Sequence, residues 1–312
     1  MEYNELANLN IKVSNLGLGC LQLGGHGWGT LSESEMVVVI HEAIDNGITF
    51  FDTAPIYGLG HSEEILGRIL GEKRNQVVIA TKAGLQWKKN GDFEKFIDAS
   101  PESIKKDIDA SLQRLRTDYI DLYQLHWPDP NTPIEETLLA MARLKKTGKI
   151  RCIGLSNFSL AQLEEARQYC RIDTIQVPYN LIDRKAERDL LPFSRENDIA
   201  VIAYSPIARG LLSGKYDAAT RFESDDHRHR NGDEYFNKEN LDRNLEIVDK
   251  VTVVAEKLHK TPAQISLRWV MENPAVTITL FGAKNVAQVR ENIQATAFTL
   301  SKDNKKFLSK EE

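Results

Sequence analysis

The feature that most constrains the fold is a unit that recurs along the chain. Each unit has a short apolar run, then a polar residue and a loop, and then a segment with the period of an amphipathic helix. Most of the runs lack the polar alternation of a half-exposed strand, so they are typical of strands buried on both faces of a parallel sheet. The eight runs lie at residues 16–21, 49–51, 77–80, 120–125, 150–155, 172–177, 200–204 and 276–281.

Eight such units over roughly 300 residues predict an α/β protein of the TIM-barrel class, a (β/α)8 barrel. Helix starts are marked by capping-box spacings, at Ser32 with Glu35, Ser159 with Gln162, and Thr261 with Gln264. A doubly wound open sheet has the same alternation, and the strand count alone does not exclude it. Because no linker or low-complexity stretch divides the chain, residues 1–312 are predicted to form a single domain.

Two segments depart from the recurring unit. Residues 3–13 have the pattern of a small β-hairpin before the first strand, and we expect it to plug the base of the barrel. Residues 205–240, after the seventh run, are too long for an ordinary βα loop of about 2–6 residues, so we expect a functional loop there. This loop contains His227 and His229, which could ligate a metal, but their charged setting favours a site without metal.

The composition excludes several classes of protein. A net charge of −5 and a pI of about 5.9 lack the basic field that non-specific nucleic-acid binding needs. No apolar run approaches the roughly 18 residues that cross a bilayer, and the N-terminus has no secretory signal. The 3 cysteines form no CxxC motif, which argues against a disulfide framework or a zinc site and favours a reducing cytoplasm.

Polar side chains stand at the ends of the apolar runs. In barrels of this class the chemistry takes place at the carboxyl ends of the strands, so these side chains are expected to converge on one mouth. They are Asp52, Thr81, Lys82, His126, Ser156, Asn157, Gln176, Tyr204 and Ser205, with Gly282 and Lys284 after the last run.

Tyr57 follows Asp52 by five residues, in a turn-rich loop that can fold over this mouth. A tyrosine phenol has a pKa near 10, and we expect the ammonium of Lys82 to lower it. Asp52 can hold Lys82 as an ion-pair partner, and His126 can orient an oxygen at the same point. Such a site can protonate a developing alkoxide, or deprotonate an alcohol in the reverse direction.

Neither an activated nucleophile nor a metal-ligand set accompanies these residues, so proton transfer to oxygen needs a partner that moves electrons. Hydride from a nicotinamide is the natural choice. A Rossmann fingerprint is missing, since Gly17-x-Gly19 is followed by Gln22 where the third glycine belongs. The barrel mouth must therefore bind the cofactor by other means.

Several residues of the mouth can replace the fingerprint. Ser156, Asn157 and Gln176 can hydrogen-bond a carboxamide, and Tyr204 offers an aromatic face for the nicotinamide ring. Backbone amides along residues 205–215 can cradle a pyrophosphate. Lys284, just before a predicted helix, can meet a ribose 2′-phosphate.

With these residues in place, the chain resembles the aldo-keto reductase superfamily. The matching stretches are residues 51–58, 81–82, 125–126, 154–157, 203–206 and 282–292, in the order that the family has them. The resemblance implies a (β/α)8 barrel that uses NADP(H) to interconvert carbonyls and alcohols. It also implies that Asp52, Tyr57, Lys82 and His126 form the catalytic tetrad.

The resemblance further assigns the cofactor contacts. It places the carboxamide at Ser156, Asn157 and Gln176, the ring against Tyr204, and the nicotinamide ribose near Leu21 and Gln22, with Asp52 as a further cofactor contact. It places the pyrophosphate and adenosine phosphate along two segments, at Ser205, Pro206, Ile207, Ala208, Gly210, Leu212 and Lys215, and at Gly282, Lys284, Gln288, Glu291 and Asn292. Phe281 departs from the family, where many members have a proline.

Within the superfamily the chain resembles the bacterial general-stress or inositol-operon type of reductase. That resemblance implies a monomer acting on a small carbonyl compound, and the composition adds a cytoplasmic location with no nucleic-acid or membrane partner. The candidate substrate contacts are the aromatic side chains Trp28, Trp87 and Trp127. Two alternatives stay open: an NADP-bound regulatory redox sensor like a potassium-channel β subunit, and an NAD-dependent alcohol or polyol dehydrogenase.

Overall fold

The computed structural model describes residues 1–6, 11–25, 31–90, 92–223, 226–230 and 233–309. Its centre is a closed barrel of eight strands, and every neighbouring pair is parallel. Pairing of the last barrel strand with the first closes the ring, so the predicted barrel is confirmed and the open sheet is excluded. In ring order the strands are β3 (Leu16–Gly19), β4 (Phe50–Asp52), β5 (Val78–Ala83), β8 (Ile120–Leu125), β9 (Ile150–Ser156), β10 (Thr174–Pro178), β11 (Ala200–Tyr204) and β12 (Val276–Phe281).

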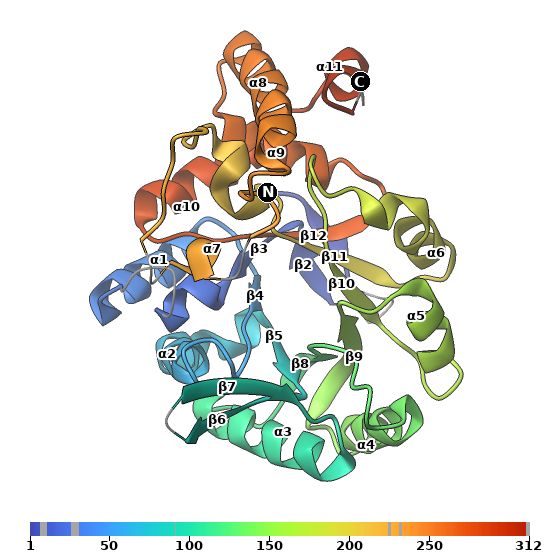
Figure 1. Ribbon diagram of the computed structural model, residues 1–312. Coiled ribbons are helices and arrows are strands. Elements are labelled where there is room, and N and C mark those ends of the chain that lie inside the picture. Colours follow the sequence, from blue (N-terminus) through green and yellow to red (C-terminus); the bar gives the residue numbers. More distant parts are fainter. Residues whose placement is uncertain (7–10, 26–30, 91, 224–225, 231–232, 310–312) are drawn as a thin grey trace.

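Helices form an outer ring around the strands (Figure 1). The helices that follow successive barrel strands are α1 (Glu33–Asp45), α2 (His61–Leu70), α3 (Pro101–Leu115), α4 (Ile134–Lys146), α5 (Leu160–Ala166), α6 (Leu190–Glu196), α9 (Pro262–Met271) and α10 (Val286–Ile293). The three capping boxes expected at Ser32, Ser159 and Thr261 are present. Each supplies partners for backbone N–H groups that the first helical turn leaves unpaired.

Further elements lie between and after these units. The long connection between β11 and α9 contains a short 3-10 helix η4 (Ala208–Ser213), α7 (His227–Arg230) and α8 (Leu241–Leu258), and the chain continues after α10 through η5 (Gln294–Ala297) to α11 (Lys302–Ser309). Three other 3-10 helices are η1 (Cys20–Gly24), η2 (Gly71–Gln76) and η3 (Lys185–Arg188). Among the helices of the described residues, none has the length and apolarity to cross a membrane.

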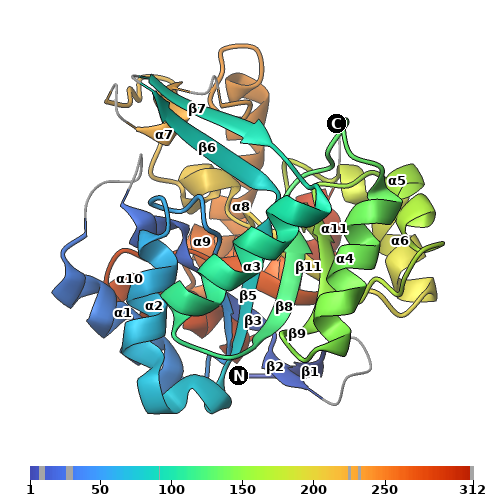
Figure 2. The same ribbon diagram turned by 90° about the horizontal axis from the view of Figure 1, so that it is seen from below.

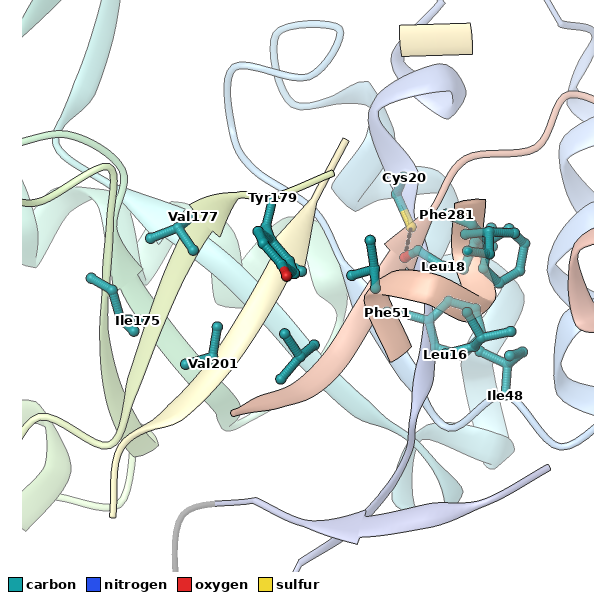
Figure 3. Close-up of a cluster of buried hydrophobic side chains, with 14 of the residues drawn as sticks. Leu16, Leu18, Cys20, Ile48, Phe51, Ile175, Val177, Tyr179, Val201 and Phe281 are labelled. Atoms are coloured by element: carbon teal, nitrogen blue, oxygen red, sulfur yellow. Dashed lines mark hydrogen bonds between the residues drawn. The ribbon is translucent and has the colours of Figure 1, made fainter. Parts of the chain in front are cut away.

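Two apolar layers explain why the barrel strands are apolar on both faces. Alternate residues of a strand point to opposite sides of the sheet. In β4, Phe50 packs into the barrel interior, whereas the next residue, Phe51, packs outward against the helices. Figure 3 shows part of this outer layer, where Leu16, Leu18 and Phe281 gather with Phe51.

The interior layer is closed at its base by the N-terminal hairpin. Strands β1 (Tyr3–Glu5) and β2 (Lys12–Ser14) pair antiparallel, as the sequence predicts. Leu6, Ile11 and Val13 pack with barrel residues such as Phe50 and Leu122. Figure 2 shows the hairpin at the end of the barrel opposite α7.

A second hairpin was not predicted. Strands β6 (Leu85–Asn90) and β7 (Asp92–Ile97) pair antiparallel between β5 and α3, and they project on the same side of the barrel as α7 (Figure 2). Polar residues interrupt the apolar residues of these strands, so no apolar run marks them in the sequence. The sequence Asn90-Gly91, which begins at the last residue of β6, is nevertheless a typical signal for a hairpin turn.

Candidate active site

A cavity of about 400 Å³ opens at the carboxyl ends of the barrel strands. Its walls include the last residues of several strands, among them Gly19, Asp52, Ser156, Tyr204 and Phe281. Because each of these strands ends at the same edge of the barrel, residues far apart in sequence meet there.

The four residues of the predicted tetrad meet at one point of this cavity. The Nζ of Lys82 lies 2.6 Å from Asp52 Oδ1 and 3.3 Å from the hydroxyl of Tyr57. It also donates to the carbonyl of Thr53 at 3.0 Å. The ring of His126 lies edge-on to that of Tyr57, with centroids 6.1 Å apart. Lys82 is buried beneath the cavity, while Asp52, Tyr57 and His126 line it.

Burial decides the protonation of Tyr57. Loss of hydration raises the pKa of the Tyr57 phenol, and the charge and hydrogen bond of Lys82 offset this only in part. The net pKa of Tyr57 is raised, which corrects the expectation of a lowered value. Since a sequence does not reveal the depth of a site, only the direction of the lysine's effect was predicted correctly. The phenol therefore keeps its proton at neutral pH.

Lys82 and His126 differ in charge at neutral pH. Burial alone would lower the pKa of Lys82, but Asp52 and Tyr57 raise it above its ordinary value, so the ammonium stays charged. Burial, followed by the charges of Lys82 and Lys95, lowers the pKa of His126 well below its ordinary value. His126 is therefore a neutral imidazole, with a hydrogen-bond donor but no charge.

Asp52 is held by more than its lysine. Its Oδ2 accepts hydrogen bonds from the amides of Gln124, at 3.2 Å, and Gln176, at 2.8 Å. Gln176 lines the cavity as expected, with its amide directed at Asp52. Gln124 was not predicted, although a lone amide within the apolar run of β8 was a signal for it.

The next part of the cavity wall is formed by hydrogen-bonded residues at the carboxyl ends of β8, β9 and β11. The hydroxyl of Tyr204 donates to Asn157 Oδ1 at 2.8 Å, and Asn157 Nδ2 donates to the carbonyl of His126 at 3.0 Å. Asn157 and Ser205 both have positive φ, at 65° and 53°. Such conformations cost energy in non-glycine residues and persist where the surroundings enforce them.

Most of the predicted cofactor residues line the same cavity. They are Leu21, Gln22, Asp52, Ser156, Asn157, Gln176, Tyr204, Ser205, Pro206, Ile207, Gly210, Lys215, Gly282, Lys284, Gln288, Glu291 and Asn292. Ala208 and Leu212 are instead fully buried beneath the loop. A Cβ at Gly282 would overlap the side-chain amide of Gln22, which would have to move to admit it.

The sequence missed the arginine that completes the far end of the cavity. Arg228 of α7 lines the cavity with Lys284. Its guanidinium makes two hydrogen bonds to Asp226, at 2.9 and 2.7 Å, and lies 4.1 Å from the centre of the Phe222 ring. Burial, and then the charge of Arg228, lowers the pKa of Lys284, so the two cations act on the same space.

The three candidate substrate residues differ in their position relative to the cavity. Trp127 lines the mouth, is 42% exposed and stacks on His126 with ring centroids 6.5 Å apart. Trp87 lies on β6, half-buried, and is not part of the cavity wall. Trp28 lies outside the described residues.

No metal site emerges from the part of the chain that the structure describes. Within those residues no three His, Cys, Asp or Glu side chains gather closely enough to hold an ion. The backbone at 227 and 229 belongs to the short helix α7, and the side chain at 227 lies outside the description.

Known proteins match this chain along nearly its whole length. The pattern of the Aldo/keto reductase family matches residues 15–309. The aldo-keto reductase YhdN of Bacillus subtilis (strain 168) is 41% identical over 312 residues, covering 99% of this chain and 93% of its own. The NADH-specific methylglyoxal reductase of Escherichia coli (strain K12) is 37% identical over 309 residues, covering 95% and 94%.

A solved structure gives the same result in three dimensions. The glycerol dehydrogenase AKR11B4 from Gluconobacter oxydans superposes with a TM-score of 0.90 at 39% identity. The match covers 98% of this chain and 93% of that one.

Proposed function

The chain belongs to the aldo/keto reductase family and is therefore an oxidoreductase that uses a nicotinamide cofactor, and on that premise we propose that it reduces aldehydes and ketones to alcohols with NADPH and with Tyr57 as the general acid. The observation that carries this proposal is the position of Lys82 Nζ, 2.6 Å from Asp52 and 3.3 Å from the Tyr57 hydroxyl, at the wall of a cavity large enough for ligands.

Proton transfer follows from the charges of these groups. Tyr57, which is protonated at neutral pH, donates its proton to the carbonyl oxygen as negative charge develops there. The ammonium of Lys82 stabilises the phenolate that results, and Asp52 holds that ammonium in place. The neutral His126 can donate a second hydrogen bond to the same oxygen without repelling Lys82. In the reverse direction the phenolate takes the proton of an alcohol.

The residues along the cavity fit a dinucleotide. Ser156, Asn157 and Gln176 offer hydrogen-bonding groups for a carboxamide beside the tetrad. At the other end, Lys284 stands just before the N-terminus of α10, a position that favours anions, and Arg228 lines the same cavity. When bound, the nicotinamide would supply or accept the hydride. Two cations at the adenosine end support NADPH over NADH, because a 2′-phosphate is the extra anion of NADPH.

The choice of cofactor has a direct test. We expect the protein to oxidise NADPH in the presence of methylglyoxal or benzaldehyde, and to bind NADPH more tightly than NADH. Lys284→Ala should weaken NADPH binding about tenfold and leave NADH binding unchanged. Lys302→Ala, on the exposed side of α11, is the matched control. An equal loss for both nucleotides in Lys284→Ala would overturn the phosphate contact.

A second candidate function is an NAD-dependent alcohol or polyol dehydrogenase. It is favoured by two relatives, one named NADH-specific methylglyoxal reductase and one named glycerol dehydrogenase. It would use the same tetrad in the reverse direction. Faster turnover with NAD⁺ and glycerol than with NADPH and either methylglyoxal or benzaldehyde would establish this function in place of the first.

The surroundings of the protein are also part of the proposal. The three cysteines, Cys20, Cys152 and Cys170, are all free thiols, as a reducing compartment requires. This supports a cytoplasmic location. We expect a monomer with a small-molecule substrate, and light scattering of the purified protein will test the monomer.

A further inference from the structure

The first turn of α2 is bonded to the chain neighbours of both members of the ion pair of the site. Two adjacent residues, Ser62 and Glu63, are fully buried there. Ser62 bonds to Thr53, and Glu63 bonds to Thr81. Thr53 directly follows Asp52, and Thr81 directly precedes Lys82. Two contacts of one helical turn therefore reach the neighbours of both members of the ion pair.

Ser62 links the loop that carries Tyr57 to Cys20 and Thr53, the residues that directly follow β3 and β4. Its backbone N–H donates to the carbonyl of Tyr57 at 3.2 Å. Its hydroxyl donates to the carbonyl of Cys20 at 2.9 Å, so the hydroxyl of Thr53 donates to Ser62, also at 2.9 Å. The carbonyl of Thr53 in turn accepts the 3.0 Å bond from Lys82 Nζ. A continuous chain of hydrogen bonds thus joins the backbone of Tyr57 to the ammonium of Lys82.

Glu63 links the same turn to β5 and α3. Its Oε1 accepts the hydroxyl of Thr81 at 2.6 Å, and its Oε2 accepts Nε of Arg114 at 2.6 Å. The side chain of Arg114 also packs against Gly60, where a Cβ would lie 2.8 Å from its Cδ. A buried carboxylate is costly unless it is fully paired, so Glu63 holds its two partners, Thr81 and Arg114, in one arrangement.

We propose that Ser62 and Glu63 are positioning residues that fix the separation of the Tyr57 hydroxyl and the Lys82 ammonium. The inference rests on the proposed function, because it concerns the acid of that reaction. Neither residue lines the cavity, so neither is expected to touch substrate or cofactor.

The expected consequence is a change in the acidity of Tyr57. The titratable groups that face Tyr57 are Lys82 from β5, Asp52 from β4, Cys20 from η1, His126 after β8, and Tyr204 from β11. Lys82 is the group that lowers the pKa of Tyr57, by its charge and its hydrogen bond. If the first turn of α2 loosens, this contact lengthens and the pKa of Tyr57 rises further. The rising limb of the pH profile for alcohol oxidation, which needs the phenolate, then moves to higher pH.

The test uses variants that remove one hydroxyl at a time, that of Thr81 on β5 or that of Ser62 on α2. Thr81→Val removes the hydroxyl that Glu63 accepts and keeps the shape, and Thr81→Ser restores the hydroxyl. Ser62→Ala removes the other link, and its control is Ser194→Ala, a buried serine of α6 whose hydroxyl has no partner within the described residues. We expect Thr81→Val and Ser62→Ala to lower kcat about tenfold, with the nucleotide Kd within about twofold, and to shift the pH limb upward. Thr81→Ser and Ser194→Ala should stay near the wild type.

The inference is overturned if folded Thr81→Val and Ser62→Ala retain the kcat and pH profile of the wild type, or if Ser194→Ala loses as much. If Ser62→Ala does not fold, the pair Thr81→Val and Thr81→Ser decides. If the wild type turns over no carbonyl or alcohol, the proposed function fails by itself. The positioning is then tested by the tyrosinate absorbance of Tyr57, taken as the difference between each variant and the same variant carrying Tyr57→Phe. An unchanged titration would contradict it.

Discussion

The two ends of the barrel are built from the same strands but are filled by different kinds of side chain. At the base, Leu6, Ile11 and Val13 of the N-terminal hairpin close an apolar interior. At the mouth, buried polar groups are packed instead, with Lys82 and Asp52 at the centre. Burying apolar area stabilises the fold, whereas burying an ion pair rarely does. The base is therefore the end that stabilises the protein, and the mouth is the end at which we propose that the chemistry takes place.

The backbone shows the same contrast. Away from the cavity, positive φ angles at Arg116 and His259 end α3 and α8, an ordinary use of that conformation. At the mouth, positive φ angles occur at Asn157, Ser205 and Arg209, in residues that line the cavity. Strain at the mouth thus shapes a site, and the rest of the barrel supplies the stability that tolerates it.

The largest effect that separates the two ends is expected for Lys82→Met. Turnover should fall by about 10²–10⁴-fold, because Tyr57 loses the charge that stabilises its phenolate. The protein should also lose about 3–5 kcal/mol of stability, since Asp52 becomes a buried unpaired charge. Urea unfolding and steady-state rates measure both. The double variant Asp52→Asn with Lys82→Met should regain unfolding free energy without regaining turnover. A double variant as unstable as Lys82→Met alone would contradict this account of the mouth.

The matching variant at the base is Leu6→Ala. Leu6 is fully buried under the barrel, so its truncation should cost about 2–5 kcal/mol of unfolding free energy. The kcat of the folded variant should equal that of the wild type, as the base is remote from the site. Lys12→Ala, exposed on β2, is the control for stability. A loss of kcat in Leu6→Ala without a loss of stability would contradict the assignment of stability to the base and of turnover to the mouth.

A smaller effect is expected from the pH dependence of stability. The pKa of His126 is lowered well below its ordinary value of 6.5 in the folded protein, so the unfolded chain binds its proton first as the pH falls. The contribution of His126 to stability is therefore full above its unfolded pKa and is lost as the pH drops toward the folded value. The difference in unfolding free energy between the wild type and His126→Asn should shrink over this range. A difference that grows toward acid pH would reverse the assignment of a neutral imidazole.

The sequence predicted the base of this molecule better than the mouth. The eight strands and the hairpin plug follow from apolar runs, and the distribution of apolar residues decides burial. The hairpin β6–β7 was missed because lysines and acidic residues interrupt its apolar residues, so no apolar run marks either strand.

At the mouth, the convergence of Asp52, Lys82 and His126 could be predicted from strand ends, but the electrostatics of the cluster could not. The raised pKa of Tyr57 depends on the depth of burial, which no spacing encodes. Gln124 reaches Asp52 across 72 positions of sequence, and Arg228 reaches the cavity from the middle of a long irregular segment. Such contacts follow from the closed ring of strands and from loop conformation rather than from any local pattern.

The most direct test of the central claim is the kcat of Tyr57→Phe with NADPH and an aldehyde, measured beside its NADPH dissociation constant. The substitution removes one oxygen and leaves the ion pair of Lys82 with Asp52 in place. We predict a loss of turnover of at least about 100-fold with nucleotide binding within about twofold of the wild type. Wild-type turnover in this variant would show that another group delivers the proton.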